Sequence, residues 1–213
     1  MNFEQQCKQI TEQLGNNNNA LKSPQFIINE LYSSIKSTTK RLHSNSTKLQ
    51  TLEMVRIFKL AVGLAYQEAP LNVLSAMIFK YPSYGCSYCE SPTCCEGCEG
   101  LARNSDLPII YDPEQEDWDI RTWQNHNIDV YGHKNEAKTL DFLVLKIYEE
   151  LREVTELIEQ LDALEGDPQI PQEAKTPQIE KIRDSLGYEF SDLIQSILAV
   201  ANKMSFDVQQ FTD

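Results

Sequence analysis

Two long segments of the chain repeat apolar residues every three and four positions, which is the spacing of one face of an α-helix. The first segment carries this pattern at Leu140, Leu143, Ile147, Leu151, Val154, Ile158 and Leu161. The second segment carries it at Ile179, Ile182, Leu186, Phe190, Leu193, Ile197, Val200 and Met204. We expect two amphipathic helices that pack stripe against stripe and need further helices to cover them.

The first hundred residues also show helical patterns, so the sequence predicts an all-α fold, a helical bundle. A first helix presents one apolar face made of Phe3, Cys7, Ile10 and Leu14. Ser23 and Pro24 then mark a helix start, as an N-cap followed by proline at the first helical position. Further apolar helical runs occupy residues 49–66 and 71–81, and the second stops before Pro82.

Acidic residues gather on one shoulder of each long amphipathic segment, at Glu149, Glu150, Glu153, Glu189 and Asp192. At about 100° per residue, stripe-to-stripe packing would bring Glu150 and Glu153 close to Glu189 and Asp192. Carboxylates that converge in this way raise one another's pKa, and a divalent cation removes the penalty. Hard oxygen ligands favour Mg²⁺ or Mn²⁺. The ion would be held by Glu150, Glu153, Glu189 and Asp192. The alternative is that the acids are solvated faces of acidic helices.

These acidic helices resemble a known family. A helix with EExxE, followed after a loop by a helix with ExxD, is similar to the all-α nucleoside triphosphate pyrophosphohydrolases of the MazG type. The similarity extends upstream to TWQNHNIDVYGHKN, residues 122–135, and downstream to LAVANKMSFDV, residues 198–208. The resemblance implies a MazG-like catalytic helical domain at residues 121–213. It also implies Mg²⁺-dependent cleavage of a nucleoside triphosphate between the α and β phosphates, giving monophosphate and pyrophosphate.

Catalytic roles follow from this hypothesis for Glu149, Glu150 and Glu153. Glu149 would support the others, either as a ligand of a second metal ion or by orienting the attacking water. The expected substrate-binding residues are Trp123, His133, Lys134, Asn135 and Asn202. The Trp123 ring would stack on a base, although a tryptophan at the start of an amphipathic helix is more often core. The three residues after the expected Tyr131-Gly132 turn would reach phosphates or the base, or else form an ordinary polar turn.

The helical unit at residues 23–84 has features of a degenerate internal repeat. When Glu53-Met-Val-Arg56 is laid over Glu189-Phe-Ser-Asp192, the apolar residues that follow correspond moderately well. Arg56 stands where an acid is needed, and only Glu30 remains in the preceding helix, so this copy cannot chelate a metal in the same way. The companion helices would come from such a copy or from a second subunit, which leaves a homo-oligomer open.

A cysteine-rich segment occupies residues 85–100 in the middle of the chain. Cys86-x2-Cys89 and Cys95-x2-Cys98 could present four thiolates to a structural Zn²⁺, with Cys94 as a substitute ligand. Close clustering of cysteines in an intracellular chain favours metal over disulfides. Some MazG-like proteins carry a similar KYP-x-C-x-x-C segment after a helical unit. There the segment continues as Cys-x-Cys, whereas this chain has Cys-Cys-x-x-Cys, so we expect a zinc knuckle without assigning its ligands from the family.

The remaining segments are expected to be an N-terminal helix with an Asn-rich linker, residues 1–22, and a proline-rich acidic connector, residues 101–120. A net charge of -13 argues against a nucleic-acid partner, because phosphate backbones are bound by basic patches. With neither a signal segment nor a long apolar run, we expect a soluble cytoplasmic protein without a membrane partner.

Two other classes of function remain open from the sequence. One is a non-catalytic helical scaffold or partner-binding protein with a structural zinc knuckle. The other is a zinc-dependent nucleic-acid module, which the acidic composition of the cysteine segment disfavours. The sequence contains no glycine-rich phosphate loop and no Ser, Cys or His arrangement typical of a covalent intermediate.

Overall fold

The computed structural model describes residues 1–16, 23–41, 47–69, 72–83, 85–86, 89, 91–94 and 112–211. These residues form seven α-helices and two short 3₁₀ helices and contain no strand, which confirms the all-α prediction. The α-helices are α1 (Phe3–Asn16), α2 (Pro24–Arg41), α3 (Thr47–Glu68), α4 (Asn72–Lys80), α5 (Ile120–Ala137), α6 (Leu140–Gly166) and α7 (Gln172–Lys203). The 3₁₀ helices are η2 (Pro113–Asp117) and η3 (Val208–Phe211).

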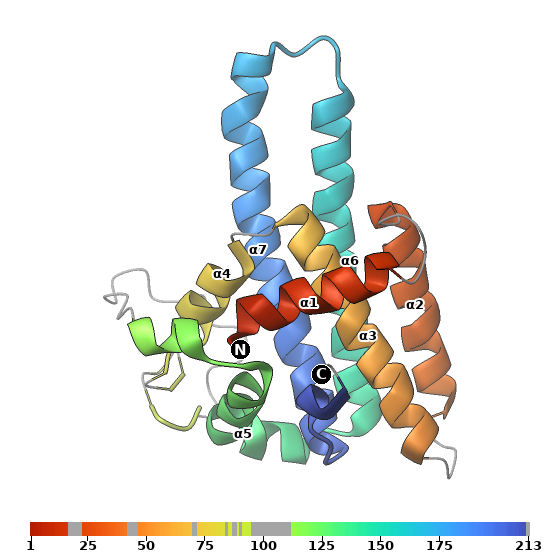
Figure 1. Ribbon diagram of the computed structural model, residues 1–213, viewed down its shortest axis with the longest axis vertical. Coiled ribbons are helices and arrows are strands. Elements are labelled where there is room, and N and C mark those ends of the chain that lie inside the picture. Colours follow the sequence, from red (N-terminus) through yellow and green to blue (C-terminus); the bar gives the residue numbers. More distant parts are fainter. Residues whose placement is uncertain are drawn as a thin grey trace.

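Four helices form the central bundle of the molecule (Figure 1). α6 lies along α7, α7 packs against α3, α3 against α2, and α2 against α6. The apolar stripes of α6 and α7 are buried at this centre, and Leu151, Val154, Leu186, Phe190 and Leu193 are each 0% exposed. The covering helices that the two stripes require therefore come from the N-terminal half of the same chain.

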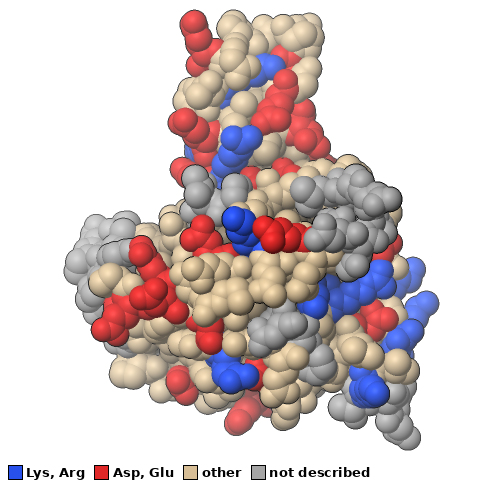
Figure 2. All heavy atoms as spheres, in the orientation of Figure 1, with Lys and Arg blue, Asp and Glu red and all other residues tan. Residues whose placement is uncertain are grey.

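The distal ends of α6 and α7 project as a two-helix hairpin from the body (Figure 1). Acidic side chains are prominent on this hairpin, while basic ones gather on the edge of the body that α2 and α3 occupy (Figure 2). α7 begins at Gln172 and includes Pro177, although proline is most common at the first position of a helix. Proline in an early turn of the helix removes only one backbone donor. The Lys175 ammonium donates to the Glu165 carbonyl at 2.9 Å and holds this start of α7 onto α6.

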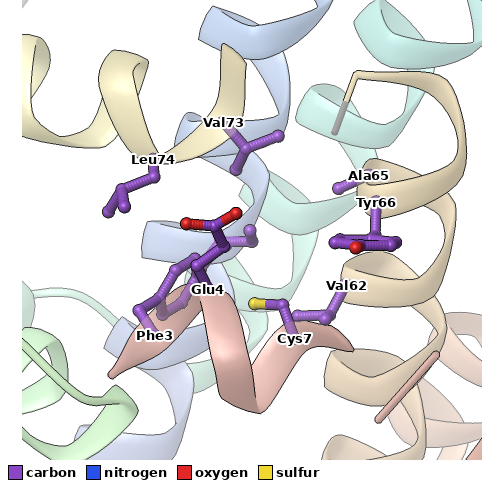
Figure 3. Close-up of a pocket in the computed structure, with 9 residues that line it drawn as sticks. Phe3, Glu4, Cys7, Val62, Ala65, Tyr66, Val73 and Leu74 are labelled. Atoms are coloured by element: carbon purple, nitrogen blue, oxygen red, sulfur yellow. The ribbon is translucent and has the colours of Figure 1, made fainter. Parts of the chain in front are cut away.

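The shorter helices pack around the bundle, with α1 across α3 and with α4 and α5 against α7 (Figure 1). A cavity of about 20 Å³ lies where α1 meets α3, α4 and α7 (Figure 3), which is room for roughly one water molecule. Cys7 lines it and is buried, as the sequence predicts, and burial raises the pKa of its thiol well above the ordinary value. This cavity is too small for a nucleotide.

α5 continues as a helix through Tyr131 and Gly132 to Ala137, so the expected Tyr-Gly turn is wrong. A glycine inside a helix costs about 1 kcal/mol relative to alanine, and tertiary packing offsets a cost of this size. On this helix Val130 is 2% exposed and packs against Cys86 and Cys94. Among the described residues, no helix is long and apolar enough to cross a membrane.

Candidate functional site

Three of the predicted acids converge where α6 and α7 run side by side. Glu150 and Glu153 lie one turn apart on α6, and Glu189 faces them from α7. One carboxylate oxygen from each of the three lies within 4.8 Å of the other two. Mg²⁺ binds oxygen ligands at about 2.0–2.1 Å, which places two of its ligands at most about 4.2 Å apart, so a small side-chain adjustment would let a single cation contact all three oxygens.

The three carboxylates differ in burial, and this difference shifts their pKa values. The Glu150 side chain is 6% exposed, whereas that of Glu153 is 42% exposed. Burial raises the pKa of Glu150, although the ion pair with Lys146 opposes the shift. Burial also raises the pKa of Glu189 to about 7, with Asp192 and Glu153 adding to the shift and Lys80 opposing it. Without a metal ion, the cluster therefore holds a proton more readily than isolated acids do.

Lys146 provides part of the countercharge from the same helix. Its ammonium lies 2.6 Å from a Glu150 oxygen and 3.5 Å from a Glu149 oxygen. Glu149 itself is half exposed, with a side-chain exposure of 52%. It lies at the outer edge of the cluster rather than among the three converging oxygens.

Asp192, the fourth predicted ligand, is held by two residues from the end of α4. The Lys80 ammonium forms an ion pair with one Asp192 oxygen, and the Tyr81 hydroxyl donates to the other at 2.6 Å. Burial and the adjacent Asp192 charge raise the pKa of Tyr81. Asp192 is close enough to raise the pKa of Glu150 and Glu189, but it lies outside the group of three converging oxygens.

The turn that carries Lys80 and Tyr81 is fixed from the start of the C-terminal half. Gln115, in η2, is 0% exposed. Its side chain donates to the Tyr81 carbonyl at 2.9 Å and accepts from the Ser83 amide at 3.1 Å. The Tyr81 ring also meets the Tyr131 ring of α5 edge to face, with centroids 5.9 Å apart. Lys80 and Tyr81 were not predicted as site residues. They belong to the KYP segment that ends the N-terminal helical unit, and this segment is the sequence signal that could have identified them.

The cysteine segment forms a second candidate metal centre. The sulfur atoms of Cys86, Cys89 and Cys94 lie within 4.8 Å of one another, and those of Cys86 and Cys94 are 3.3 Å apart. Cys94, considered only as a substitute ligand, therefore joins this group, while Cys95 and Cys98 lie outside the described residues. Burial and the neighbouring Cys86 thiol raise the pKa of Cys94 to about 11, and Lys134 opposes this shift.

Gly85 shapes this centre, and α5 anchors it. Gly85 has φ +130, and a Cβ atom there would lie 2.3 Å from the Ser91 carbonyl oxygen. The same oxygen accepts from the Cys86 amide at 3.0 Å, and the Cys94 amide donates to the Val130 carbonyl at 2.9 Å. The segment is thus closed on itself and docked on α5.

Three of the expected substrate-binding residues lie near the end of α5. Lys134 interacts with the Cys94 thiol and so belongs to the surroundings of the cysteine centre. His133 is exposed, and Asn135 is half-buried and accepts from the Lys138 amide through its backbone carbonyl at 3.3 Å. His133 is not among the side chains that converge at the carboxylate cluster.

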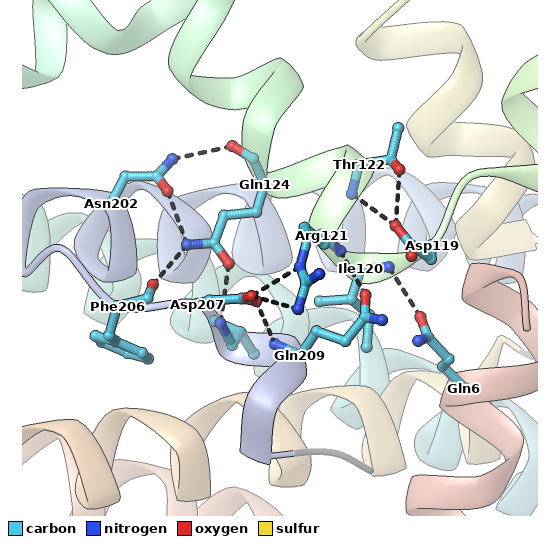
Figure 4. Close-up of polar contacts among 11 residues, drawn as sticks. Gln6, Asp119, Ile120, Arg121, Thr122, Gln124, Asn202, Phe206, Asp207 and Gln209 are labelled. Carbon is cyan, nitrogen blue, oxygen red and sulfur yellow. Dashed lines mark hydrogen bonds and ion pairs between the residues drawn. The ribbon is translucent and has the colours of Figure 1, made fainter.

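Trp123 and Asn202 both contact other side chains of the fold. Trp123 is 0% exposed and packs against other rings, so it occupies the core position that was the alternative to base stacking. Asn202 exchanges hydrogen bonds with Gln124 (Figure 4), and its side-chain amide also donates to Asn127. It lies 13 residues beyond Glu189, which corresponds to about 20 Å along a helix. The same region ties the C-terminal segment to α5, with Arg121 paired to Asp207 at 2.7 Å (Figure 4).

An open groove between α2 and α6 is a separate hollow. It is lined by Tyr32, Ser33, Ile35, Lys36, Thr39, Lys40 and Tyr148. Tyr148 precedes Glu150 by two residues, so the two side chains point in directions about 160° apart around α6. The groove therefore opens away from the carboxylate cluster.

Comparison of the chain with protein-family models, curated proteins and solved structures finds no match. The functional conclusion therefore depends on the residues themselves and on the resemblance of their motifs.

Proposed function

We propose that this protein is a Mg²⁺-dependent nucleoside triphosphate pyrophosphohydrolase of the MazG type. The observation that supports this most is the convergence of Glu150, Glu153 and Glu189 from two antiparallel helices. The EExxE and ExxD motifs were the basis for expecting these oxygens together. The donor set fits Mg²⁺ or Mn²⁺, because all its atoms are carboxylate oxygens and part of the set faces solvent.

In this proposal the chain's own side chains divide the work. Glu150, Glu153 and Glu189 hold the ion, and Asp192 joins them when its present partners release it. A bound divalent ion supplies charge to offset that developing on the phosphate and makes a coordinated water more acidic. Glu149, at the solvent edge, orients the attacking water or contacts a second ion. The products are a nucleoside monophosphate and pyrophosphate.

We propose a structural role for the cysteine centre, with Zn²⁺ held by Cys86, Cys89 and Cys94. A fourth thiolate would come from Cys95 or Cys98. Sulfur atoms within 4.8 Å of one another fit tetrahedral zinc, whose Zn–S bonds are about 2.3 Å long. A closed four-thiolate site leaves no position for a substrate, so its role is to stabilise the turn that leads from Tyr81.

A nucleotide screen tests the proposed reaction. Purified protein is incubated with Mg²⁺ and a panel of canonical and modified nucleoside triphosphates, and pyrophosphate release is measured beside Glu153→Gln and Asp192→Asn variants. We expect turnover of at least one nucleotide by the wild type and loss of turnover in both variants, with helical content unchanged by circular dichroism. Absence of turnover across the panel would favour the non-catalytic scaffold instead.

A further inference from the structure

Lys80 reaches the carboxylate cluster from the other half of the chain. Its ammonium forms an ion pair with Asp192 and lies 3.4 Å from the Tyr188 carbonyl oxygen. It also lies 5.5 Å from the centre of the Tyr188 ring. The Lys80 side chain is 24% exposed, so it lies at the mouth of the cluster and can contact both the acids and solvent.

Both oxygens of Asp192 already have protein partners, Lys80 on one and Tyr81 on the other. A divalent ion that uses Asp192 as a ligand must therefore compete with the Lys80 ammonium for one of these oxygens. Tyr81 and the Gln115 contacts keep the backbone of the turn in place. An ammonium displaced from Asp192 thus stays within a side chain's length of the cluster.

The negative charge of the cluster favours a further cation, such as the Lys80 ammonium, beside the metal ion. The three converging carboxylates and Asp192 exceed the charge of one divalent ion, and a triphosphate tail adds more negative charge. Lys146 pairs with two acids of its own helix, whereas Lys80 forms an ion pair with Asp192 and opposes the rise in the pKa of Glu189. A lysine freed from its carboxylate forms charge-assisted hydrogen bonds with phosphate oxygens.

We propose that Lys80 is a phosphate-binding residue that forms an ion pair with Asp192 when no metal is bound. A divalent metal ion displaces Lys80 from this carboxylate, and the freed ammonium binds the polyphosphate part of the substrate. The inference rests on the proposed function for its substrate class. The exchange between Lys80 and metal at Asp192 is a property of the cluster itself and does not depend on hydrolysis.

The test measures two affinities with the full-length protein and a Lys80→Gln variant. The first is for Mn²⁺ alone, followed by the electron paramagnetic resonance signal of the free ion. The second is for inorganic tripolyphosphate with saturating Mg²⁺, followed by calorimetry. We expect Lys80→Gln to bind Mn²⁺ several-fold more tightly and tripolyphosphate about tenfold more weakly, a loss of about 1.4 kcal/mol, because one charge-assisted hydrogen bond to the phosphate is removed.

Two further variants separate this role from a structural one. Lys40→Gln removes the same charge from the exposed face of α2 and should change neither affinity. Lys80→Arg keeps the charge and should recover most of the tripolyphosphate binding. A variant that merely loosens the turn would weaken both ligands, so opposite changes in the two affinities identify the exchange.

The results can also overturn the inference. An unchanged or weakened Mn²⁺ affinity in folded Lys80→Gln would show that Lys80 does not compete with metal. Unchanged tripolyphosphate affinity would show that it does not bind phosphate. A wild type that binds Mn²⁺ and tripolyphosphate but hydrolyses no nucleotide would contradict the proposed reaction while leaving the role of Lys80 supported.

Discussion

The helical pairs α2–α3 and α6–α7 share a buried register but carry opposite electrostatics. With Glu53 laid over Glu189, the core residues of α3 match those of α7, each 0–1% exposed: Met54 with Phe190, Ile57 with Leu193, Phe58 with Ile194 and Ala61 with Ile197. This agreement supports the proposal that residues 23–84 are a degenerate copy of the C-terminal unit.

The acids of the two pairs are neutralised by different means. In the N-terminal pair, Arg56 forms an ion pair with Glu30, and Arg41 lies 3.3 Å from Glu53. Glu30 and Glu53 thus each pair with an arginine of the same two helices. In the C-terminal pair the acids outnumber their lysine partners, and burial raises the pKa of Glu150 and Glu189. With the same helical packing, the acids can thus be paired with arginine side chains or remain available to bind an added cation.

The largest expected effect comes from removing the Glu153 carboxylate, with the matched removal of the Glu30 carboxylate as its control. Glu153→Gln should lower Mg²⁺-dependent turnover by at least about 100-fold, because a metal's charge stabilisation is worth several kcal/mol. Glu30→Gln, the matched change in the N-terminal pair, should leave turnover within about twofold. Steady-state assays on both variants decide this, and equal losses would mean that both pairs serve the reaction.

The second-largest effect is expected at Gly85, in the turn between the two halves of the chain. Gly85→Ala places a Cβ atom 2.3 Å from the Ser91 carbonyl oxygen at a backbone with φ +130, so the cysteine segment must rearrange. We expect zinc content, measured by mass spectrometry, to fall and turnover to fall about tenfold as Lys80 and Tyr81 lose their position. Gly166→Ala is the control, because no atom lies within 4 Å of a Cβ added there. Full zinc content in Gly85→Ala would contradict this expectation.

A smaller effect concerns pH and the metal-free protein. Glu189 has a folded pKa of about 7, raised from 4.5, so the folded state binds the proton more tightly than the unfolded chain. The contribution of this carboxyl to stability therefore falls as pH rises from about 4.5 through 7. Thermal unfolding in EDTA should show this decline in the wild type relative to Glu189→Gln, which lacks the titrating group. Saturating Mg²⁺ should reduce the difference, and parallel pH profiles in EDTA would rule out the shift.

The smallest effect is expected at Arg56, which forms the ion pair with Glu30 in the N-terminal pair of helices. The side chains of Arg56 and Glu30 are 53% and 34% exposed, and exposed ion pairs contribute about 0–1 kcal/mol. Arg56→Gln should lower the free energy of unfolding by less than about 1 kcal/mol and leave Mn²⁺ affinity unchanged. Urea denaturation and metal titration measure both quantities. A large loss of metal affinity would mean that the two pairs are coupled.

Local patterns predicted the helices well and their ends less well. The apolar repeats of residues 140–161 and 179–204 identified α6 and α7 because burial enforces that period. Gly132 misled the prediction, since tertiary packing outweighs the roughly 1 kcal/mol that a glycine costs inside a helix.

The site was predictable only where it depends on helix geometry. Glu150, Glu153 and Glu189 follow from periodicity within two helices and their stripe-to-stripe packing. Lys80 and Tyr81 lie 112 and 111 residues from their partner Asp192. They reach it because α4 packs on α7, which no local pattern encodes. The burial of Trp123 likewise depends on Phe3, a residue of the first helix.

The Lys80–Asp192 and Tyr81–Asp192 contacts make the two halves of the polypeptide interdependent. A fragment beginning at residue 112 would keep every acid of the cluster but would lack the ammonium and the phenol that hold Asp192. It would also expose the apolar faces that α3 and α4 cover. The proposed activity therefore requires both halves, and we expect neither half to carry it without its counterpart.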